Sequence, residues 1–177
     1  MQKTAAGLII FTKLPHKGLV AILSRRGEFD YEHFKPQNYP NLYEVTAGGG
    51  IESGEHLIEG LLREVEEELG SAAAKLIHHY ATQFQNVGFH ERTISTDGNI
   101  ISIYTYTVFI PHFPLKLIKP HRSSAGVRTI GAKEVTDIKP FPYEKKKEGA
   151  PKDDQTVWML ADYLSGLKKG FDLYKHL

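Results

Sequence analysis

The 177-residue chain contains no cysteine, which excludes disulfides, thiolate metal sites and cysteine nucleophiles together. A surplus of charge is also absent: the formal net charge is +1, so no global field draws the protein to nucleic acid or to an anionic membrane. The longest N-terminal apolar run, AAGLIIF, is too short to span a bilayer. We therefore expect a soluble cytoplasmic protein, with no nucleic-acid or membrane partner, that binds any charged partner at a local site.

The hydrophobic content is sufficient for a core. Hydrophobic residues make up 41% of the chain, which at this length suits one domain over residues 1–177. Predicted helices cover Glu55–Leu69 and about residues 154–168, and residues 96–99 (TDGN) predict a hairpin turn. Strands of mixed length around one central and one terminal helix indicate an α/β sandwich. The predicted strands are Thr4–Leu14, Gly18–Ser24, Leu76–Gln83, Phe84–Ile94, Asn99–Ile110 and 127–130.

Glycines surround a tight turn before the central helix. The sequence AGGGIESGE places three glycines in a row at 48–50 and a fourth at Gly54. Glycines of this kind let the backbone approach a ligand closely or adopt a positive φ. Ser53 is the expected N-terminal cap of the helix, and Gly70 is placed to end it.

The central helix carries many carboxylates near its C-terminal end, in the stretch REVEEELG. Like charges there repel one another and face the negative pole of the helix dipole, at a cost of roughly 0.2–1 kcal/mol per contact. On a helical wheel Glu64, Glu67 and Glu68 share one side, separate from the apolar side, and Glu66 lies opposite Glu64. Such a cluster suits Mg²⁺ or Mn²⁺, which prefer oxygen ligands. On spacing alone, a solvated acidic helix face is an equal alternative.

Eight residues extend this pattern at fixed offsets, G-x5-E-x7-R-E-U-x-E-E-x-G, where U is aliphatic. They are Gly49, Glu55, Arg63, Glu64, Val65, Glu67, Glu68 and Gly70. The spacing resembles the Nudix box of the Nudix hydrolases. The next box position is aliphatic in that family, and here Ser71 occupies it. Because Ser71 lies past the acidic cluster, we expect this departure to affect packing more than metal binding.

The resemblance implies the Nudix α/β/α sandwich, with a mixed β-sheet, one loop-helix metal site at residues 49–71 and a C-terminal helix. It also implies Mg²⁺-dependent (or Mn²⁺-dependent) hydrolysis of the diphosphate linkage in a nucleoside diphosphate joined to another group. Glu55 and Arg63 match the family pair that ties the loop to the helix, an arrangement whose bidentate geometry favours arginine over lysine.

The same resemblance implies roles for the remaining polar box residues. Glu64, Glu67 and Glu68 match the metal-binding carboxylates, and the Gly49 carbonyl is a further candidate ligand. We expect Glu67 and Glu68 to ligate the essential cation, and Glu64 to act as a shared ligand or as the general base. Some family members take the base from a loop outside the box, for which the candidates in this chain are Glu134, Glu144 and Asp153.

Substrate recognition is expected from the second strand and the long connection after it. Arg25 and Arg26 resemble the strand-end arginines that some Nudix enzymes turn toward substrate phosphate; solvent-facing charges are the alternative. The connection, Arg25–Leu42, contains aromatic residues that either stack on a nucleobase or pack the loop against the domain. These aromatic residues are Phe29, Tyr31, Phe34 and Tyr39.

Two other functions are alternatives to a hydrolase. A Nudix-fold regulatory domain would hold a nucleotide without cleaving it, but such a domain is expected to lose box carboxylates, and this chain keeps them all. The isopentenyl diphosphate isomerase branch uses a catalytic cysteine, which this chain lacks. The sequence leaves open the leaving group, the base preference, the number of metal ions and the oligomeric state, a homodimer included.

Overall fold

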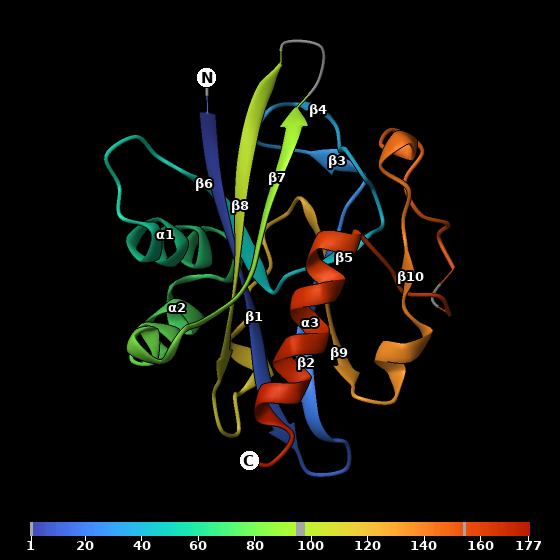
Figure 1. The fold of residues 1–177 in the computed structure, drawn as a ribbon. Coiled ribbons are helices and arrows are strands. Elements are labelled where there is room, and N and C mark those ends of the chain that lie inside the picture. Colours follow the sequence, from blue (N-terminus) through green and yellow to red (C-terminus); the bar gives the residue numbers. More distant parts are fainter. Residues whose placement is uncertain (1, 95–97, 154) are drawn as a thin grey trace.

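The computed structural model describes residues 2–94, 98–153 and 155–177. Within them, one mixed nine-stranded sheet forms the centre of the molecule, in the order β10-β11-β5-β2-β1-β8-β7, with β6 paired to β1 and β9 to β2 (Figure 1). A small separate hairpin, β3-β4, extends from the loop after β2. The strands are β1 (Gln2–Leu14), β2 (Gly18–Arg26), β3 (Phe29–Asp30), β4 (Lys35–Pro36), β5 (Tyr43–Glu44), β6 (Ala47–Ile51), β7 (Gln85–Ile94), β8 (Asn99–Phe109), β9 (Ser124–Gly131), β10 (Lys139–Pro140) and β11 (Trp158–Met159).

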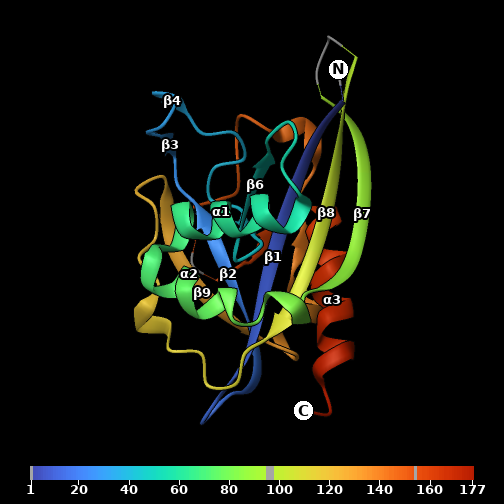
Figure 2. The ribbon, with the colours of Figure 1, turned by 90° about the vertical axis from the view of Figure 1, so that its left-hand side faces the viewer.

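Helices cover both faces of this sheet. The α-helices are α1 (Leu57–Leu69), α2 (Ser71–His78) and α3 (Ala161–Tyr174), and short 3-10 turns lie at Ala81–Gln83, Leu115–Leu117, Glu134–Asp137 and Tyr143–Lys145. Figure 2 shows α1 and α2 crossing one face of β1 and β2, with α3 on the other side of the sheet. The predicted α/β/α sandwich with a mixed sheet and a C-terminal helix is therefore confirmed.

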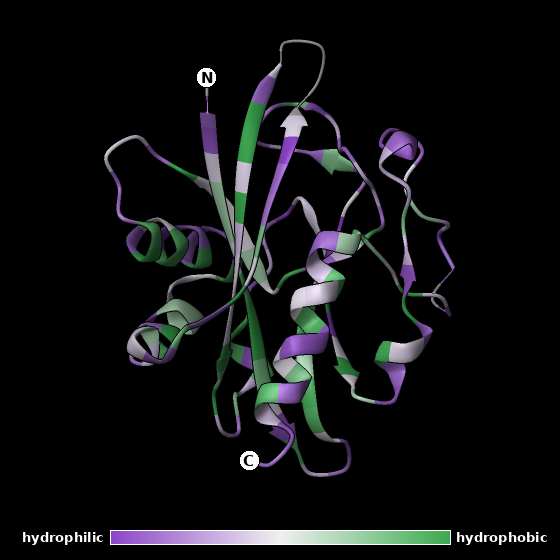
Figure 3. Cartoon of the chain, viewed as in Figure 1, coloured by the Kyte–Doolittle hydropathy of each residue, from purple (hydrophilic) through white to green (hydrophobic). Residues whose placement is uncertain are grey.

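Strand β1 lies at the centre because both of its faces are apolar. Leu8 and Ile10 belong to the core beneath α1 and α2, while Ile9 and Phe11 belong to the core beneath α3. Side chains alternate between the two faces of a strand, so one uninterrupted apolar run supplies both cores. Figure 3 shows this hydrophobic band along β1 and β2. Against it, α3 approaches so closely that a Cβ on Gly170 would collide with the Phe11 ring.

One predicted strand is wrong. Residues 76–83 are not extended: α2 ends at His78, and a 3-10 turn follows at Ala81–Gln83. The five residues just before this segment, SAAAK, include three alanines, and alanine is the strongest helix former. Ala73, Ala74 and Ile77 are buried at helical spacing, so packing against the core selects a helix. Ser71, which stands where the Nudix box has an aliphatic residue, is the first residue of α2.

Other predicted boundaries also need correction. The C-terminal helix begins at Ala161 instead of near residue 154, because β11 occupies Trp158–Met159 first, and it continues to Tyr174. The N-cap of α1 is His56 rather than Ser53. The strand expected at residues 127–130 is longer at both ends as β9, and the TDGN turn lies largely outside the described residues.

The remaining predicted elements are confirmed to within two residues. They are β1, β2, β7, β8 and α1. In the part of the chain that the structure describes, no helix is both long and apolar enough to cross a membrane.

Candidate active site

Glycines at the end of β6 allow α1 to lie directly against the sheet. Gly48 pairs with Gly7 of β1, and a Cβ on Gly48 would collide with the β1 backbone. A Cβ on Gly49 would collide with the carboxylate of Glu64, whereas one on Gly50 would meet nothing within 4 Å. Gly49 is therefore required for Glu64 to reach the strand backbone, which is a packing reason for a glycine at that box position.

The loop between β6 and α1 is fastened by the predicted Glu55–Arg63 pair. Arg63 Nε donates to Glu55 Oε1 at 3.0 Å and its Nη2 to Glu55 Oε2 at 3.2 Å. The same Nη2 donates to the Gly50 carbonyl at 2.8 Å, and the Glu52 amide donates to Glu55 at 2.9 Å. The hydrogen bonds from Arg63 lower the pKa of Glu55. This planar, forked geometry is specific to arginine, so the pair fixes the loop as predicted.

The three box carboxylates line one cavity on the loop side of α1, although their oxygens do not all lie within 4.8 Å of one another. Arg63 Nη1 donates to Glu64 Oε1 at 2.8 Å and to Glu67 Oε1 at 3.1 Å. Glu68 Oε2 accepts the Gly48 amide at 2.9 Å, so it too is held against β6. Glu66 and Glu67 are both exposed, but Glu66 lines a different pocket, beside α2, whereas Glu67 shares a cavity with Glu64 and Glu68. The wheel therefore separated the residues correctly.

Burial and like charge destabilise the ionised form of two of these groups. The pKa of Glu68 is raised to about 8 by burial first, and then by the charges of Glu44 and Glu64, which outweigh the Gly48 amide and Arg26. The pKa of Glu64 is also raised, chiefly by burial, against the opposing effect of Arg63. The positive charges of Arg63 and Arg26 therefore do not offset the burial of Glu64 and Glu68.

These carboxylates line a cavity of about 460 Å³, which we call the carboxylate cavity. Its described lining includes six carboxylates but only two arginines. The box residues in this cavity offer oxygen ligands only, which a hard divalent cation prefers. Such a cation would also offset the excess negative charge, which would otherwise repel a diphosphate. The lining residues are Ser24, Arg25, Arg26, Asp30, Glu32, His33, Gln37, Glu44, Glu64, Glu67, Glu68, His121, Ser123 and Ser124.

The two strand-end arginines have different surroundings. Arg26 donates to Glu44 Oε2 at 2.9 Å, to the Asn38 carbonyl at 2.9 Å and to Gln37 Oε1 at 3.1 Å. Its guanidinium therefore holds the long connection against β5. Arg25 lies 5.6 Å over the ring of Tyr43, its neighbour on β5. Both arginines line the carboxylate cavity.

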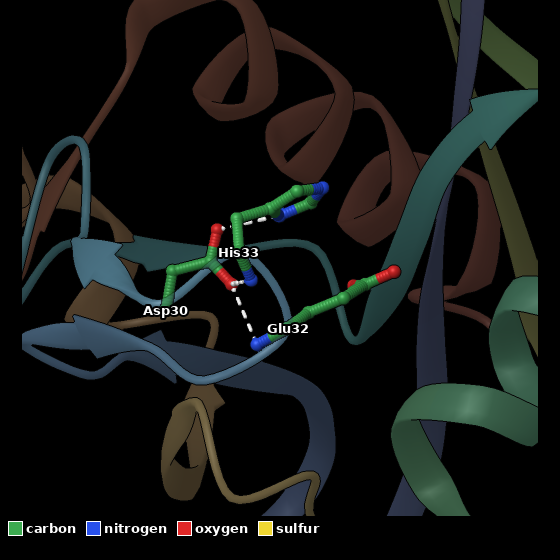
Figure 4. Close-up of side chains that lie close together, drawn as sticks. All are labelled: Asp30, Glu32 and His33. Carbon is green, nitrogen blue, oxygen red and sulfur yellow. Dashed lines mark hydrogen bonds and ion pairs between the residues drawn. The ribbon is translucent and has the colours of Figure 1, made fainter.

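Sequence reasoning missed three residues in the β3-β4 hairpin. Asp30, Glu32 and His33 are the one group of three potential metal ligands in the described chain whose donor atoms lie within 4.8 Å of one another. The Asp30 carboxylate already accepts the backbone amides of Glu32 and His33, and it lies 2.9 Å from His33 Nδ1 (Figure 4). Because the hairpin satisfies Asp30 internally, we assign no ion to it. Glu32 lies close enough to Glu64 to help raise its pKa. The only sequence signal was the polar stretch DYEH.

The alternative general bases lie outside the carboxylate cavity. Glu134 accepts the Gly131 amide at 2.7 Å and lies 3.9 Å from Arg128. Asp153 accepts the amides of two residues just after it, and Glu144 lines a neighbouring cavity. Nothing in their positions favours them over Glu64.

The loop aromatics separate into two groups. Phe29 packs against Tyr31 and Phe34, with ring centroids 5.0 and 6.3 Å away, so these three hold the hairpin together. Tyr39 instead lines the neighbouring cavity.

Comparison with known proteins agrees with this geometry. The model of the NUDIX domain family matches residues 1–148. No curated protein matches the chain. Among solved structures, the NUDIX domain of Shewanella oneidensis NrtR, complexed with ADP ribose, has a TM-score of 0.60 at 13% identity, over 98% of this chain and 88% of that one.

Two further structures share the fold. The MutT protein from Methanosarcina mazei Go1 has a TM-score of 0.59 at 14% identity, over 99% of this chain and 96% of that one. The C. elegans Ap4A hydrolase has a TM-score of 0.50 at 15% identity, over 99% of each chain. At such identities the structures show the fold alone, whereas the family model covers most of the sequence. This chain belongs to the NUDIX domain family.

Proposed function

We propose that this protein is a divalent-cation-dependent pyrophosphohydrolase that cleaves the diphosphate linkage of a nucleoside diphosphate joined to another group. The observation that carries the proposal is the convergence of Glu64, Glu67 and Glu68 on one cavity, with a glycine loop and the Glu55–Arg63 pair holding them there. A solvated acidic helix face would need neither the close approach at Gly49 nor buried carboxylates.

The proposed cation is Mg²⁺ or Mn²⁺, held by Glu64, Glu67 and Glu68 with the Gly49 carbonyl as a further ligand. When bound, it would neutralise phosphate oxygens and lower the pKa of a water molecule. Glu68 and Glu67 would provide its main ligands, and binding would release any proton that Glu68 holds, because a ligating carboxylate must be ionised.

The chain's own residues position and activate the reaction. Glu64 is proposed as a shared ligand or as the general base, since it lines the cavity and the alternatives outside the box do not. Glu55 and Arg63 are positioning residues: their ion pair fastens the loop, and Arg63 also holds the Glu64 carboxylate in place. Arg25 and Arg26 are the proposed contacts for substrate phosphate, and Arg26 also anchors the long connection.

Two structural neighbours support the substrate class. The NrtR domain is complexed with ADP ribose, which is a nucleoside diphosphate joined to a sugar, and another neighbour is an Ap4A hydrolase. We propose a small-molecule nucleotide of this kind as the partner, and the cytoplasm as the location. A regulatory domain without catalysis is the alternative, against which the complete set of box carboxylates argues.

The test is product release from a panel of nucleoside triphosphates, ADP ribose, other nucleotide sugars, NADH and diadenosine polyphosphates, with Mg²⁺, with Mn²⁺ and with chelator. Glu68→Gln should lower turnover about a thousandfold, by analogy with the loss of other preorganised charge-stabilising groups. Glu66→Gln is the matched control, because Glu66 is exposed on the same helix turn. Nucleotide binding without chelator-sensitive turnover would replace the hydrolase with the regulatory domain.

A further inference from the structure

A second, larger cavity adjoins the carboxylate cavity. It has a volume of about 850 Å³ and shares Arg26 and Glu44 with its neighbour. These two residues form an ion pair at 2.9 Å, which therefore stands between the two spaces. We call the larger space the tyrosine cavity. It is lined by Arg26, Asn38, Tyr39, Leu42, Tyr43, Glu44, Glu91, Arg92, Thr93, Ile101, Tyr143, Glu144, Lys146, Leu160, Asp162 and Tyr163.

The tyrosine cavity has flat aromatic walls and a buried apolar floor. Tyr39 donates a hydrogen bond to the Tyr143 carbonyl at 3.1 Å, which ties the two wall segments together. Burial raises the pKa of Tyr163 to about 12. Leu42 and Leu160 are 1% and 6% exposed. Aromatic and aliphatic surfaces of this kind suit a planar ring, and a volume in this range is typical of small-molecule sites.

The charges in the tyrosine cavity are nearly balanced. Its described lining contains four carboxylates and three cationic side chains, against six and two in the carboxylate cavity. A polyanion gains little from a balanced site, whereas an uncharged heterocycle with hydrogen-bonding edges fits it. The charged diphosphate and the neutral ring of one nucleotide would therefore occupy different cavities.

Asp162 places a mostly buried carboxylate in this cavity. Its side chain is 16% exposed, and Oδ1 lies 3.7 Å from His90 Nδ1. The same His90 ring donates through Nε2 to the Asp162 carbonyl at 3.1 Å. Burial and the nearby Asp162 carboxylate raise the pKa of Tyr143, and the Tyr143 ring lies beneath Arg92 at 5.2 Å. An ionised carboxylate at this position accepts N–H groups and has no donor of its own.

We infer that the tyrosine cavity binds the base of the nucleoside whose diphosphate lies in the carboxylate cavity, and that Asp162 accepts a hydrogen bond from an exocyclic amino group of that base. This inference deepens the proposed function and rests on it. It predicts a preference for amino-bearing bases, because removing the amino group would leave the carboxylate of Asp162 without that donor.

The test measures nucleoside binding separately from hydrolysis. Affinities of guanosine and inosine, and of adenosine and purine riboside, would be measured by calorimetry or saturation-transfer NMR with chelator present. Each pair differs by one amino group. We expect the amino-bearing member to bind about tenfold more tightly to the wild type. Asp162→Asn should remove most of this difference, and Asp172→Asn, at an exposed site on the same helix, should keep it.

The outcomes distinguish this inference from the proposed hydrolysis. Glu68→Gln should lose turnover yet keep nucleoside affinity within about twofold, because Glu68 does not line the tyrosine cavity. If the protein hydrolyses nucleotides but Asp162→Asn leaves the amino preference intact, or if no nucleoside binds, the inference is overturned and the hydrolase stands. If nucleosides bind as expected and the whole substrate panel is inert, the hydrolase fails and the base site stands. Tyr143→Leu, expected to weaken all four nucleosides about tenfold, checks the location if Asp162→Asn unfolds.

Discussion

The carboxylate cavity and the tyrosine cavity meet at one ion pair, Arg26–Glu44, yet they have opposite chemistry. One has far more carboxylates than cationic groups, and the other is close to neutral with aromatic walls. A negative cavity needs added cations before it can bind phosphate, whereas a neutral aromatic cavity binds a ring without them. This difference supports the proposed division of phosphate binding and base recognition between two parts of the chain.

The two cavities are separated by the paired ends of strands β2 and β5. Ser24 of β2 pairs with Glu44 of β5 in the sheet, and β2 ends at Arg26. On one side of that edge lies α1 with the box glutamates; on the other lie β7 and the start of α3. Because each side is fixed by different elements, substitutions should affect catalysis and base binding separately.

The largest separation is expected from Gly49→Ala. The added methyl group would collide with the Glu64 carboxylate, so the proposed base and metal ligand would move. We expect kcat to fall about a hundredfold with nucleoside affinity unchanged, because displaced groups at a preorganised site cost this much. Steady-state kinetics check it, with Gly50→Ala as the control since its Cβ meets nothing within 4 Å. Equal activity of the two variants would contradict the close approach.

The charge imbalance of the carboxylate cavity should appear in the stability of the metal-free protein. The folded-state pKa of Glu68 is raised to about 8, so between its ordinary value and pH 8 the folded protein binds a proton that the unfolded chain does not. Stability from this group is therefore present at low pH and is lost as pH rises toward 8. We expect Glu68→Gln to become more stable than wild type by about 1–2 kcal/mol at pH 8.5, relative to the difference at pH 5.

Chemical denaturation with chelator at the two pH values measures this difference. Addition of Mg²⁺ at pH 8.5 should stabilise the wild type and leave Glu68→Gln nearly unchanged, because bound ligand stabilises only the folded state that holds it. A wild type that gains stability over the variant as pH rises would show that the ionised Glu68 is already compensated within the protein.

The smallest effect is expected in the tyrosine cavity from Arg92→Lys. Arg92 lies 5.2 Å over the Tyr143 ring, and lysine keeps the charge but loses the flat guanidinium stacking. We expect KM to rise about threefold with kcat unchanged, because Arg92 lines only the tyrosine cavity, the proposed site of the base, and not the carboxylate cavity. A fall in kcat with constant KM would place this residue in the chemistry and erase the distinction between the cavities.

Helix α1 could be predicted from sequence because its signals are local. Apolar residues at helical spacing predicted α1 to within two residues of its observed start, and the period of 3.6 separated Glu66 from the site carboxylates. Glu55 and Arg63 are only eight residues apart, and two hydrogen bonds join their side chains. Helix α2 was missed because a short apolar segment fits a strand or a helix, and only packing decides between them.

The tyrosine cavity could not be predicted, because sheet topology assembles it from distant segments. Tyr39 and Tyr143 are 104 positions apart in the chain and yet hydrogen-bonded. Asp162 reaches the cavity because α3 begins there, and the sequence placed the start of that helix several residues too early. The hairpin carboxylate Glu32 had no motif to mark it. Its place beside Glu64 follows from how the β3-β4 hairpin returns over α1.

The most direct test of the central claim is anomalous diffraction from crystals grown with Mn²⁺. We predict an anomalous peak in the carboxylate cavity within coordination distance of Glu64, Glu67 and Glu68, and close to the Gly49 carbonyl, with no peak there in Glu68→Gln crystals. A peak only at Asp30 and His33, or none at all with Mn²⁺ in large excess, would contradict the assignment of the box carboxylates as the metal site.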